Sequence, residues 1–227
     1  SSNFSRNTKL ANYSWFNLGG PAEYFFKPDD KKQLIEFLRE NKNKNKLKIT
    51  VLGAGSNTLI RDNGIKGVVI KLGSGFSKIK LISDNLIEAG ASILDRKISS
   101  FAKEKGISCL EFLSCIPGSV GGAVIMNSGC YGEDISKVLH SIKAIDINEC
   151  VEKEIKADDI DFFYRGTNLS KNLIITSVIL KGENRPKEFI EKKQNEMINK
   201  KKLSQPSQAK TCGSTFKNLD LKKKAWE

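Results

Sequence analysis

Residues 116–123 read Ile116-Pro117-Gly118-Ser119-Val120-Gly121-Gly122-Ala123, and the chain continues to Gly132 as Val-Ile-Met-Asn-Ser-Gly-Cys-Tyr-Gly. The five glycines between Gly118 and Gly132 are more than close packing alone requires. Pro117 fixes its own φ, and the next residue, Gly118, is conformationally free because it has no Cβ. The segment therefore predicts a loop that enters a helix or a turn with unpaired backbone N–H groups, which can bind a phosphate.

A second glycine-rich segment follows an apolar stretch earlier in the chain, as Val51-Leu52-Gly53-Ala54-Gly55-Ser56-Asn57. Glycines let successive N–H groups point into one concavity, and small side chains let a phosphate approach. The segment lacks the third glycine and the following helix of a Rossmann fingerprint, and by itself it is equally typical of a tight structural turn. The two segments together favour a ligand with a diphosphate and a flat ring, such as a dinucleotide or a flavin. The alternative is that the glycines serve close strand packing.

The hydrophobic pattern around these segments predicts strands, helices and a hairpin turn. A helix beginning at 28–30 should bury Leu34, Ile35, Phe37 and Leu38 and end in the lysine/asparagine stretch, and a second helix, 93–105, should have Ser92 as N-cap and stop at Gly106. Pro186 should open a third helix with Phe189, Ile190, Met197 and Ile198 inside. Strands are expected over 22–26, 47–52, 67–72, 79–82, 86–89, 140–148 and 173–180, with a turn at 84–85. This order predicts an α+β fold.

Composition and charge narrow the classes of function. The 227 residues include no apolar run of the ~20 residues that a bilayer span needs, and no secretory signal, so we expect a cytoplasmic protein with no membrane partner. The formal net charge of +12 comes mainly from lysine runs such as Lys200-Lys201-Lys202. Because these runs lack arginine forks and interleaved aromatic residues, a solvated surface is favoured over binding of an anionic partner, and no nucleic acid is expected.

The five cysteines and the single histidine, His140, give little support to a metal site. No Cys-x-x-Cys pair occurs and the number of cysteines is odd, so reduced thiols are the simplest interpretation and no metal is expected. His140 falls in a predicted strand, where a structural role is favoured over a catalytic one.

Two further segments carry candidate site residues. Tyr164-Arg165 follows Asp161-Phe162-Phe163, and an arginine among aromatic residues is suited to bidentate binding of a carboxylate, although a surface ion pair explains it equally well. The segment 212–218 reads Cys-Gly-Ser-Thr-Phe-Lys-Asn. Its Ser214 has no acid or histidine nearby in sequence to make it a nucleophile, and a capping role is the simpler interpretation.

Taken together and in order, these segments resemble the UDP-N-acetylenolpyruvoylglucosamine reductase family, from about residue 7 to the end of the chain. The resemblance is to the shorter type that lacks an extra insertion. No single motif is specific, but the ordered set is. The matching segments are 17–24 (Asn-Leu-Gly-Gly-Pro-Ala-Glu-Tyr), 51–57, 67–70, 110–112, 116–123, 126–129, 164–165 and 213–218.

The resemblance implies a two-part FAD-binding fold of the vanillyl-alcohol-oxidase/PCMH type, followed by part of an α+β substrate domain. The expected units are residues 1–62 and 63–183 for FAD binding and 184–227 for the start of the substrate domain. Non-covalent FAD is then expected to contact residues in both glycine-rich segments and beyond them, namely Gly53, Ala54, Gly55, Ser56, Asn57, Gly118, Ser119, Gly121, Gly122, Ala123 and Asn127.

The resemblance also implies a reaction: NADPH reduces the flavin, which then delivers hydride to the enolpyruvyl ether of UDP-N-acetylglucosamine in peptidoglycan precursor synthesis. An enol ether is a poor hydride acceptor, so the site must stabilise the enolate that forms at the substrate carboxylate. In this resemblance Arg165 is a stabiliser of the enolate and Ser214 is the proton donor. Tyr164, Lys217 and Asn218 hold the substrate. A monomer is expected.

The sequence departs from the family pattern in three places. Ala54 stands at a usual glycine, and Gly166-Thr167 follows Arg165 where another residue and a serine are more usual. The chain ends at Ala225-Trp226-Glu227, where the resemblance implies a further part of the substrate domain with a glutamate that assists Arg165, and hence a C-terminally truncated chain with little turnover. The alternatives are an FAD-binding remnant without reductase activity, another flavin oxidase of the same fold and, on charge alone, a nucleic-acid-binding protein.

Overall fold

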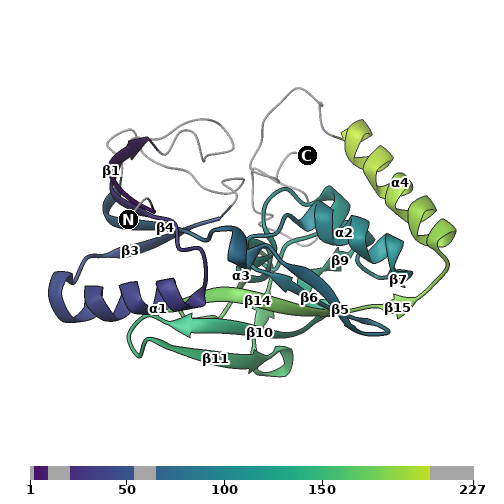
Figure 1. Cartoon of the computed structure of the whole chain (residues 1–227). Helices are drawn as coiled ribbons and strands as arrows, with labels where there is room; N and C mark the ends of the chain where they lie inside the picture. The colour runs from purple at the N-terminus through teal and green to yellow at the C-terminus, as the bar shows by residue number, and fades with distance from the viewer. Residues whose placement is uncertain (1–2, 10–20, 54–64, 205–227) are drawn as a thin grey trace.

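The computed structural model describes residues 3–9, 21–53 and 65–204 (Figure 1). Within them, the chain forms two main sheets, three two-stranded pairs and four α-helices. Figure 1 shows the smaller sheet and the first helix on the left, the larger sheet across the lower middle, and the last helix on the right. Helices and strands do not alternate regularly, so the predicted α+β class is confirmed.

The smaller sheet is built from the N-terminal part of the chain, in the order β1-β2-β4-β3. β1 runs antiparallel to β2, whereas β2 and β3 both run parallel to β4. The parallel arrangement requires a crossover, which α1 supplies between β2 and β3. The bounds are β1 Phe4–Lys9, β2 Pro21–Phe26, α1 Lys31–Glu40, β3 Ile49–Leu52 and β4 Ile65–Lys71.

Helix α1 forms where the sequence predicts it. Asp30 is the N-cap, and its carboxylate accepts a hydrogen bond of 2.9 Å from the Gln33 N–H, which has no partner within the helix. Leu34 and Leu38 are buried, at the helical spacing that the sequence shows. The lysine/asparagine stretch does not end the helix at once, because it adds a π-helical turn over Asn41–Asn45.

The larger sheet is antiparallel throughout, in the order β11-β10-β14-β6-β5. The turn at 84–85 joins β5 to β6, as predicted. Its strands are β5 Ile79–Ser83, β6 Leu86–Gly90, β10 Leu139–Asp146, β11 Val151–Lys156 and β14 Leu173–Lys181. The two-stranded pairs are β7 Ile107–Ser108 with β15 Glu183–Asn184, β8 Gly129–Cys130 with β9 Glu133–Asp134, and β12 Phe162–Phe163 with β13 Gly166–Thr167.

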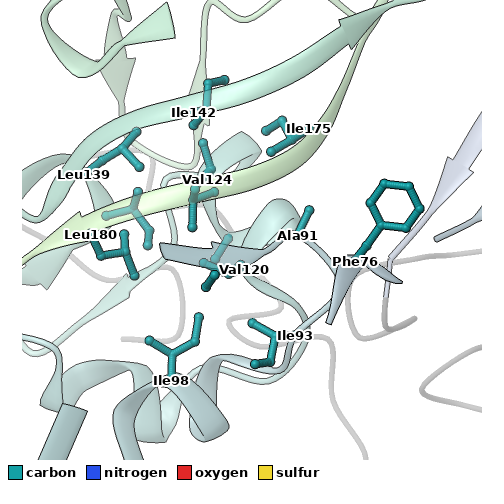
Figure 2. Close-up of a cluster of buried hydrophobic side chains, with 14 of the residues drawn as sticks. Phe76, Ala91, Ile93, Ile98, Val120, Val124, Leu139, Ile142, Ile175 and Leu180 are labelled. Atoms are coloured by element: carbon teal, nitrogen blue, oxygen red, sulfur yellow. The ribbon is translucent and has the colours of Figure 1, made fainter. Parts of the chain in front are cut away.

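Three further helices, α2 (Asp95–Glu104), α3 (Val120–Ile125) and α4 (Lys187–Ser204), complete the fold. The short helix α3 packs against β6 and β14 and lies at the centre of the main core. Figure 2 shows Val120 and Val124 between Ile142 on one side and Ile98 on the other. The core therefore fixes the position of the glycine-rich loop from which α3 emerges.

Two predictions about helix contacts are wrong. Ser92 does not cap α2, because its hydroxyl donates to the Phe76 carbonyl at 2.8 Å and the helix begins only at Asp95. Phe189 is 49 % exposed rather than part of the inner stripe of α4. Gln194 is buried there instead, and its amide donates to the Ser99 hydroxyl at 2.7 Å.

Asp95 is a buried acid with no hydrogen-bond partner for its carboxylate in the part of the chain that the structure describes. Burial raises its pKa well above the usual value, because desolvation disfavours the charged form. A carboxyl whose pKa is higher in the folded state than in the unfolded state makes its full contribution to the free energy of unfolding below about pH 4. This contribution to stability is lost as the pH rises from about 4 through the folded-state pKa.

We therefore expect Asp95→Asn to be more stable than the wild type at pH 7. The difference should grow with pH at a slope of up to about 1.4 kcal/mol per pH unit between about pH 4 and the folded-state pKa. Urea unfolding of both proteins at pH 4, 5, 6 and 7 measures it, with exposed Asp158→Asn as the control. A difference that is the same at every pH would contradict a buried, neutral Asp95.

Candidate functional site

A cavity of about 320 Å³ opens between the C-terminal ends of β3 and β4 and the glycine-rich loop before α3. Its walls come from five places in the chain that the fold brings together. The described residues that line it are Val51, Leu52, Gly53, Lys71, Leu72, Ala91, Ser92, Leu94, Pro117, Gly118, Ser119, Gly121, Gly122, Ala123, Ile125, Met126, Ser128, Leu173, Ile174 and Ile175. A cavity of this size is in the range of small-molecule sites.

The two glycine-rich segments meet at this cavity. A Cβ atom added to Gly53 would lie 3.4 Å from the Ser119 hydroxyl oxygen, so the end of β3 and the start of α3 are in contact. The segments were identified separately in the sequence, and the structure places the described part of both in one wall. Ala54, Gly55, Ser56 and Asn57 lie outside the described residues, and their predicted role in binding FAD stays a prediction.

The loop before α3 is tied to the connection between β6 and α2 by its backbone. The Val120 N–H donates to the Ile93 carbonyl at 3.0 Å, and the Gly121 N–H donates to the Ala91 carbonyl at 2.9 Å. The expectation that the loop presents unpaired N–H groups is therefore wrong for these two residues. Instead, these two hydrogen bonds fix the loop to the connection between β6 and α2.

Gly121 and Gly122 have different surroundings. A Cβ atom on Gly121 would lie 3.0 Å from the Ala91 Cβ and 3.1 Å from the Ala91 carbonyl oxygen, so this glycine permits close packing. A Cβ atom on Gly122 would have only the Ser119 hydroxyl oxygen nearby, at 3.8 Å. Gly122 thus leaves room inside the cavity, whereas Gly121 keeps the loop against the strand connection.

Lys71 is a lining residue that the sequence analysis missed. It lies at the end of β4, half-buried, and its pKa is lowered by burial and by the positive charge of Lys27. An anionic group in the cavity would offset both effects, because it would compensate the buried charge. The signal in the sequence is one lysine at the end of an apolar strand, which is also the pattern of an ordinary strand end.

Tyr164 and Arg165 form the turn between β12 and β13. Arg165 has a left-handed backbone with φ of 60°, which is uncommon for a side chain of this size and is associated with functional sites. Tyr164 is 51 % exposed, and the Arg165 guanidinium carbon lies 5.9 Å from the centre of its ring. The Thr167 hydroxyl donates to the carbonyl of Ile125, a cavity residue, at 3.3 Å, so the hairpin is attached to the rim of the cavity.

Asn127 also holds this hairpin and is not among the cavity-lining residues. Its amide nitrogen donates to the Phe163 carbonyl at 3.1 Å, and its amide oxygen accepts from the Ser136 N–H at 3.0 Å. Its own φ of 44° is one that asparagine tolerates well. The structure therefore gives Asn127 contacts that position the Tyr164–Arg165 turn, while its predicted contact with FAD stays untested.

These contacts predict a specific effect of Asn127→Asp. The aspartate keeps the acceptor for Ser136 and tolerates the same backbone, but it loses the donor to Phe163. We expect about a fivefold lower rate in any reaction that uses Arg165, since one hydrogen bond is worth about 1 kcal/mol, with FAD affinity unchanged. Flavin titration and turnover measured in parallel test this, with Thr167→Val as a second hairpin contact. A large loss of FAD affinity would instead support the cofactor-binding role.

The segment with Ser214, Lys217 and Asn218 lies outside the described residues, so their roles stay predictions. The helix that leads to it, α4, ends beside the cavity loop. The Lys201 ammonium in its last turn donates to the Cys115 carbonyl at 2.5 Å, and the Lys200 ammonium lies 5.8 Å from the centre of the Tyr131 ring. The C-terminal end of α4 is therefore fixed next to Cys115 and Tyr131.

Other sequence expectations concern metals and membranes. Among residues 3–9, 21–53 and 65–204, no group of three or more His, Cys, Asp and Glu side chains could hold a metal ion. His140 is exposed in β10, and its imidazole contacts the Ser141 hydroxyl at 3.2 Å. None of the helices in the described part of the chain is long and apolar enough to cross a membrane.

Known proteins similar to this chain agree on one family. Residues 22–151 match the model of the FAD binding domain, which is more than half of the chain. The UDP-N-acetylenolpyruvoylglucosamine reductase of Pelagibacter ubique is 46 % identical over 99 % of this chain and 74 % of its own length. That of Rickettsia canadensis is 42 % identical over the same shares of the two chains.

Solved structures agree with the sequence comparisons. The UDP-N-acetylenolpyruvylglucosamine reductase of Thermus caldophilus superposes with a TM-score of 0.80 at 30 % identity, over 95 % of this chain and 74 % of that one. An alkyldihydroxyacetonephosphate synthase, at 14 % identity and a TM-score of 0.52 over 72 % of this chain and 34 % of that one, shares the fold alone. The predicted FAD-binding fold of the vanillyl-alcohol-oxidase/PCMH type, and FAD as its cofactor, are thereby confirmed. By sequence and by structure, the chain belongs to the UDP-N-acetylenolpyruvoylglucosamine reductase family.

Proposed function

We propose that this chain is an NADPH-dependent flavoenzyme that reduces the enolpyruvyl ether of UDP-N-acetylglucosamine to UDP-N-acetylmuramate in peptidoglycan precursor synthesis. The observation that carries the proposal is the contact between Gly53 and Ser119 at one cavity, because it joins the two glycine-rich segments of the family. The division into residues 1–62, 63–183 and 184–227 is part of the same proposal. The monomeric state and the cytoplasmic location remain predictions from the sequence.

The residues of the cavity fit a flavin dinucleotide. Gly53 and Gly122 line the cavity without side chains, Gly122 leaves space there, and the Lys71 ammonium supplies a positive charge for a diphosphate. Leu173, Ile174 and Ile175 at the start of β14 add an apolar wall suited to a flat ring. When bound, FAD would accept hydride from NADPH and pass it to the alkene of the substrate.

The remaining residues stabilise charge and supply a proton. Arg165 donates to the carboxylate of the substrate, where negative charge accumulates as the enolate forms, and its planar fork suits both oxygens. Ser214 donates the proton to the enolate carbon. A serine is a weak acid, so it acts only because the enolate is a strong base within hydrogen-bond reach. Tyr164, Lys217 and Asn218 hold the UDP-sugar in this orientation.

Two half-reactions measured without oxygen test the proposal. NADPH should bleach the flavin absorbance of the FAD-loaded chain, and the enolpyruvyl sugar should restore it with formation of UDP-N-acetylmuramate. Failure of the first step argues against NADPH as the reductant. A chain that is reduced by NADPH but not reoxidised by the sugar would favour the alternative, an FAD-binding protein without reductase activity.

The Arg165→Ala substitution separates these steps further. We expect reduction of the flavin by NADPH at the wild-type rate and reoxidation by the sugar slowed about a hundredfold, as for the loss of one charge-stabilising donor. Stopped-flow absorbance measures both, and exposed Arg39→Ala is the matched control. Equal rates of reoxidation in Arg165→Ala and the wild type would remove Arg165 from the mechanism.

A further inference from the structure

Two cysteines meet beside the cavity loop, outside the proposed reaction. Cys115 ends the 3-10 turn Glu111–Cys115 and is buried, and Cys130 lies in β8 and is partly exposed. β8 packs against this turn, and the Cys130 thiol reaches the carbonyl of Phe112, three residues before Cys115 in the same turn, so the two cysteine side chains are neighbours. The Cys130 thiol donates to the Phe112 carbonyl at 3.6 Å, and the Ser114 hydroxyl lies 3.8 Å from the Cys115 sulfur.

The surroundings shift the pKa values of the two thiols in opposite directions. The neighbouring Cys130 side chain lowers the pKa of Cys115 to about 6, against the effect of burial, with smaller contributions from Ser114 and the Lys201 ammonium. The Cys115 side chain and burial raise the pKa of Cys130. Lys201 is held in place by its bond to the Cys115 carbonyl. The surroundings therefore favour the thiolate on Cys115 and the proton on Cys130.

We propose that Cys115 and Cys130 form a modification site that a hydroperoxide converts to a reversible disulfide. The Cys115 thiolate attacks one peroxide oxygen, the O–O bond breaks, and the other oxygen leaves with a proton as water or an alcohol. The Cys130 sulfur then attacks the sulfenic acid formed on Cys115, and the hydroxyl leaves as water with the Cys130 proton. Two thiols are oxidised, one peroxide is reduced, and no further reactant is needed.

Other cysteines in the described part of the chain lack this arrangement. The pKa of Cys109 is raised by burial and by nearby Glu183 and Glu111, which disfavours its thiolate. Cys150 is buried, and its sulfur lies 3.4 Å from the Ile147 carbonyl. Reaction should therefore be selective for the pair. Residues 116–129, which include the loop before α3, lie between the two cysteines, so the disulfide would close the chain around this loop.

The test maps thiols in the folded, full chain after treatment with a small excess of hydrogen peroxide. Free thiols are then alkylated, and the protein is digested and analysed by mass spectrometry. Because residues 116–129 contain no Lys or Arg, trypsin leaves both cysteines in one peptide. We expect that peptide to carry a Cys115–Cys130 disulfide, to be two hydrogen atoms lighter than its reduced form and to be restored by dithiothreitol. Cys115→Ala and Cys130→Ser should each abolish the cross-link, and Cys109→Ser should keep it.

A second measurement needs no substitution at Cys115. The rate of Cys115 alkylation by iodoacetamide in the wild type should reach half its maximum near pH 6, as its lowered pKa requires, and at higher pH in Cys130→Ser. Three results would overturn the proposal. They are full alkylation of both cysteines after peroxide treatment, a sulfinic acid on Cys115 without a cross-link, and pairing of either cysteine with Cys212.

Discussion

Gly122→Leu should leave the fold intact and weaken FAD binding at least a hundredfold, which corresponds to about 3 kcal/mol. Gly122 lies in α3 and lines the cavity, and an added Cβ would meet only the Ser119 hydroxyl oxygen, at 3.8 Å. A leucine there should project into the space that the cofactor needs. Because leucine favours a helix over glycine, the apoprotein should be as stable as the wild type or more stable by up to about 1 kcal/mol.

The neighbouring glycine is the matched control. Gly121→Leu introduces the same side chain one residue earlier, where a Cβ would lie 3.1 Å from the Ala91 carbonyl oxygen. We expect this variant to be destabilised by about 1–3 kcal/mol, the usual range for overpacking. Thermal unfolding of the apoproteins and FAD titration by flavin fluorescence distinguish the two effects. Normal FAD affinity in a folded Gly122→Leu protein would contradict the assignment of this cavity to FAD.

Ser214→Ala should leave reduction of the flavin by NADPH intact and slow the reaction with the enolpyruvyl sugar by about 10²–10⁴-fold, the usual contribution of a positioned proton donor. The reason is chemical: hydride addition leaves an enolate, which must be protonated at carbon before product forms. Removing the hydroxyl leaves only bulk water as the donor. FAD affinity should not change, since the flavin is held elsewhere.

Ser204→Ala is the control for this substitution. Ser204 ends α4, ten residues before Ser214, and its hydroxyl bonds to the Lys201 carbonyl at 3.2 Å. Its loss should not alter either half-reaction. Product formed from the sugar in deuterated buffer gives a second readout, because the solvent isotope effect on reoxidation should change when Ser214 is absent. If both half-reactions of Ser214→Ala slowed equally, the residue would not be the proton donor.

Local patterns in the sequence were sufficient for most of the fold. The spacing of Leu34 and Leu38 and the cap at Asp30 place α1, and Gly106, with φ of 69°, stops α2 where predicted. Each of these features depends on residues a few positions apart. Where the determinant is distant in sequence the predictions failed, as with Ser92, which bonds to Phe76, and Gln194, which replaces Phe189 inside by bonding to Ser99.

In the candidate site, too, local features could be predicted from the sequence, whereas features that depend on distant residues could not. The glycine-rich segments could be found from the sequence because glycine clusters are conspicuous, and the resemblance to one family connected them. Lys71 could not, because a single lysine at a strand end is ordinary until the fold places it in a cavity wall. The bonding of the Val120 and Gly121 N–H groups could not be foreseen either, since their partners are about 30 residues earlier in the chain.

An experimental structure of the chain with FAD tests the central claim most directly. The account predicts one FAD per chain in this cavity, with its diphosphate against the two glycine-rich segments and its ring beside Gly122 and the start of β14. FAD bound at another surface, or a cavity that stays empty in crystals grown with saturating FAD, would contradict it.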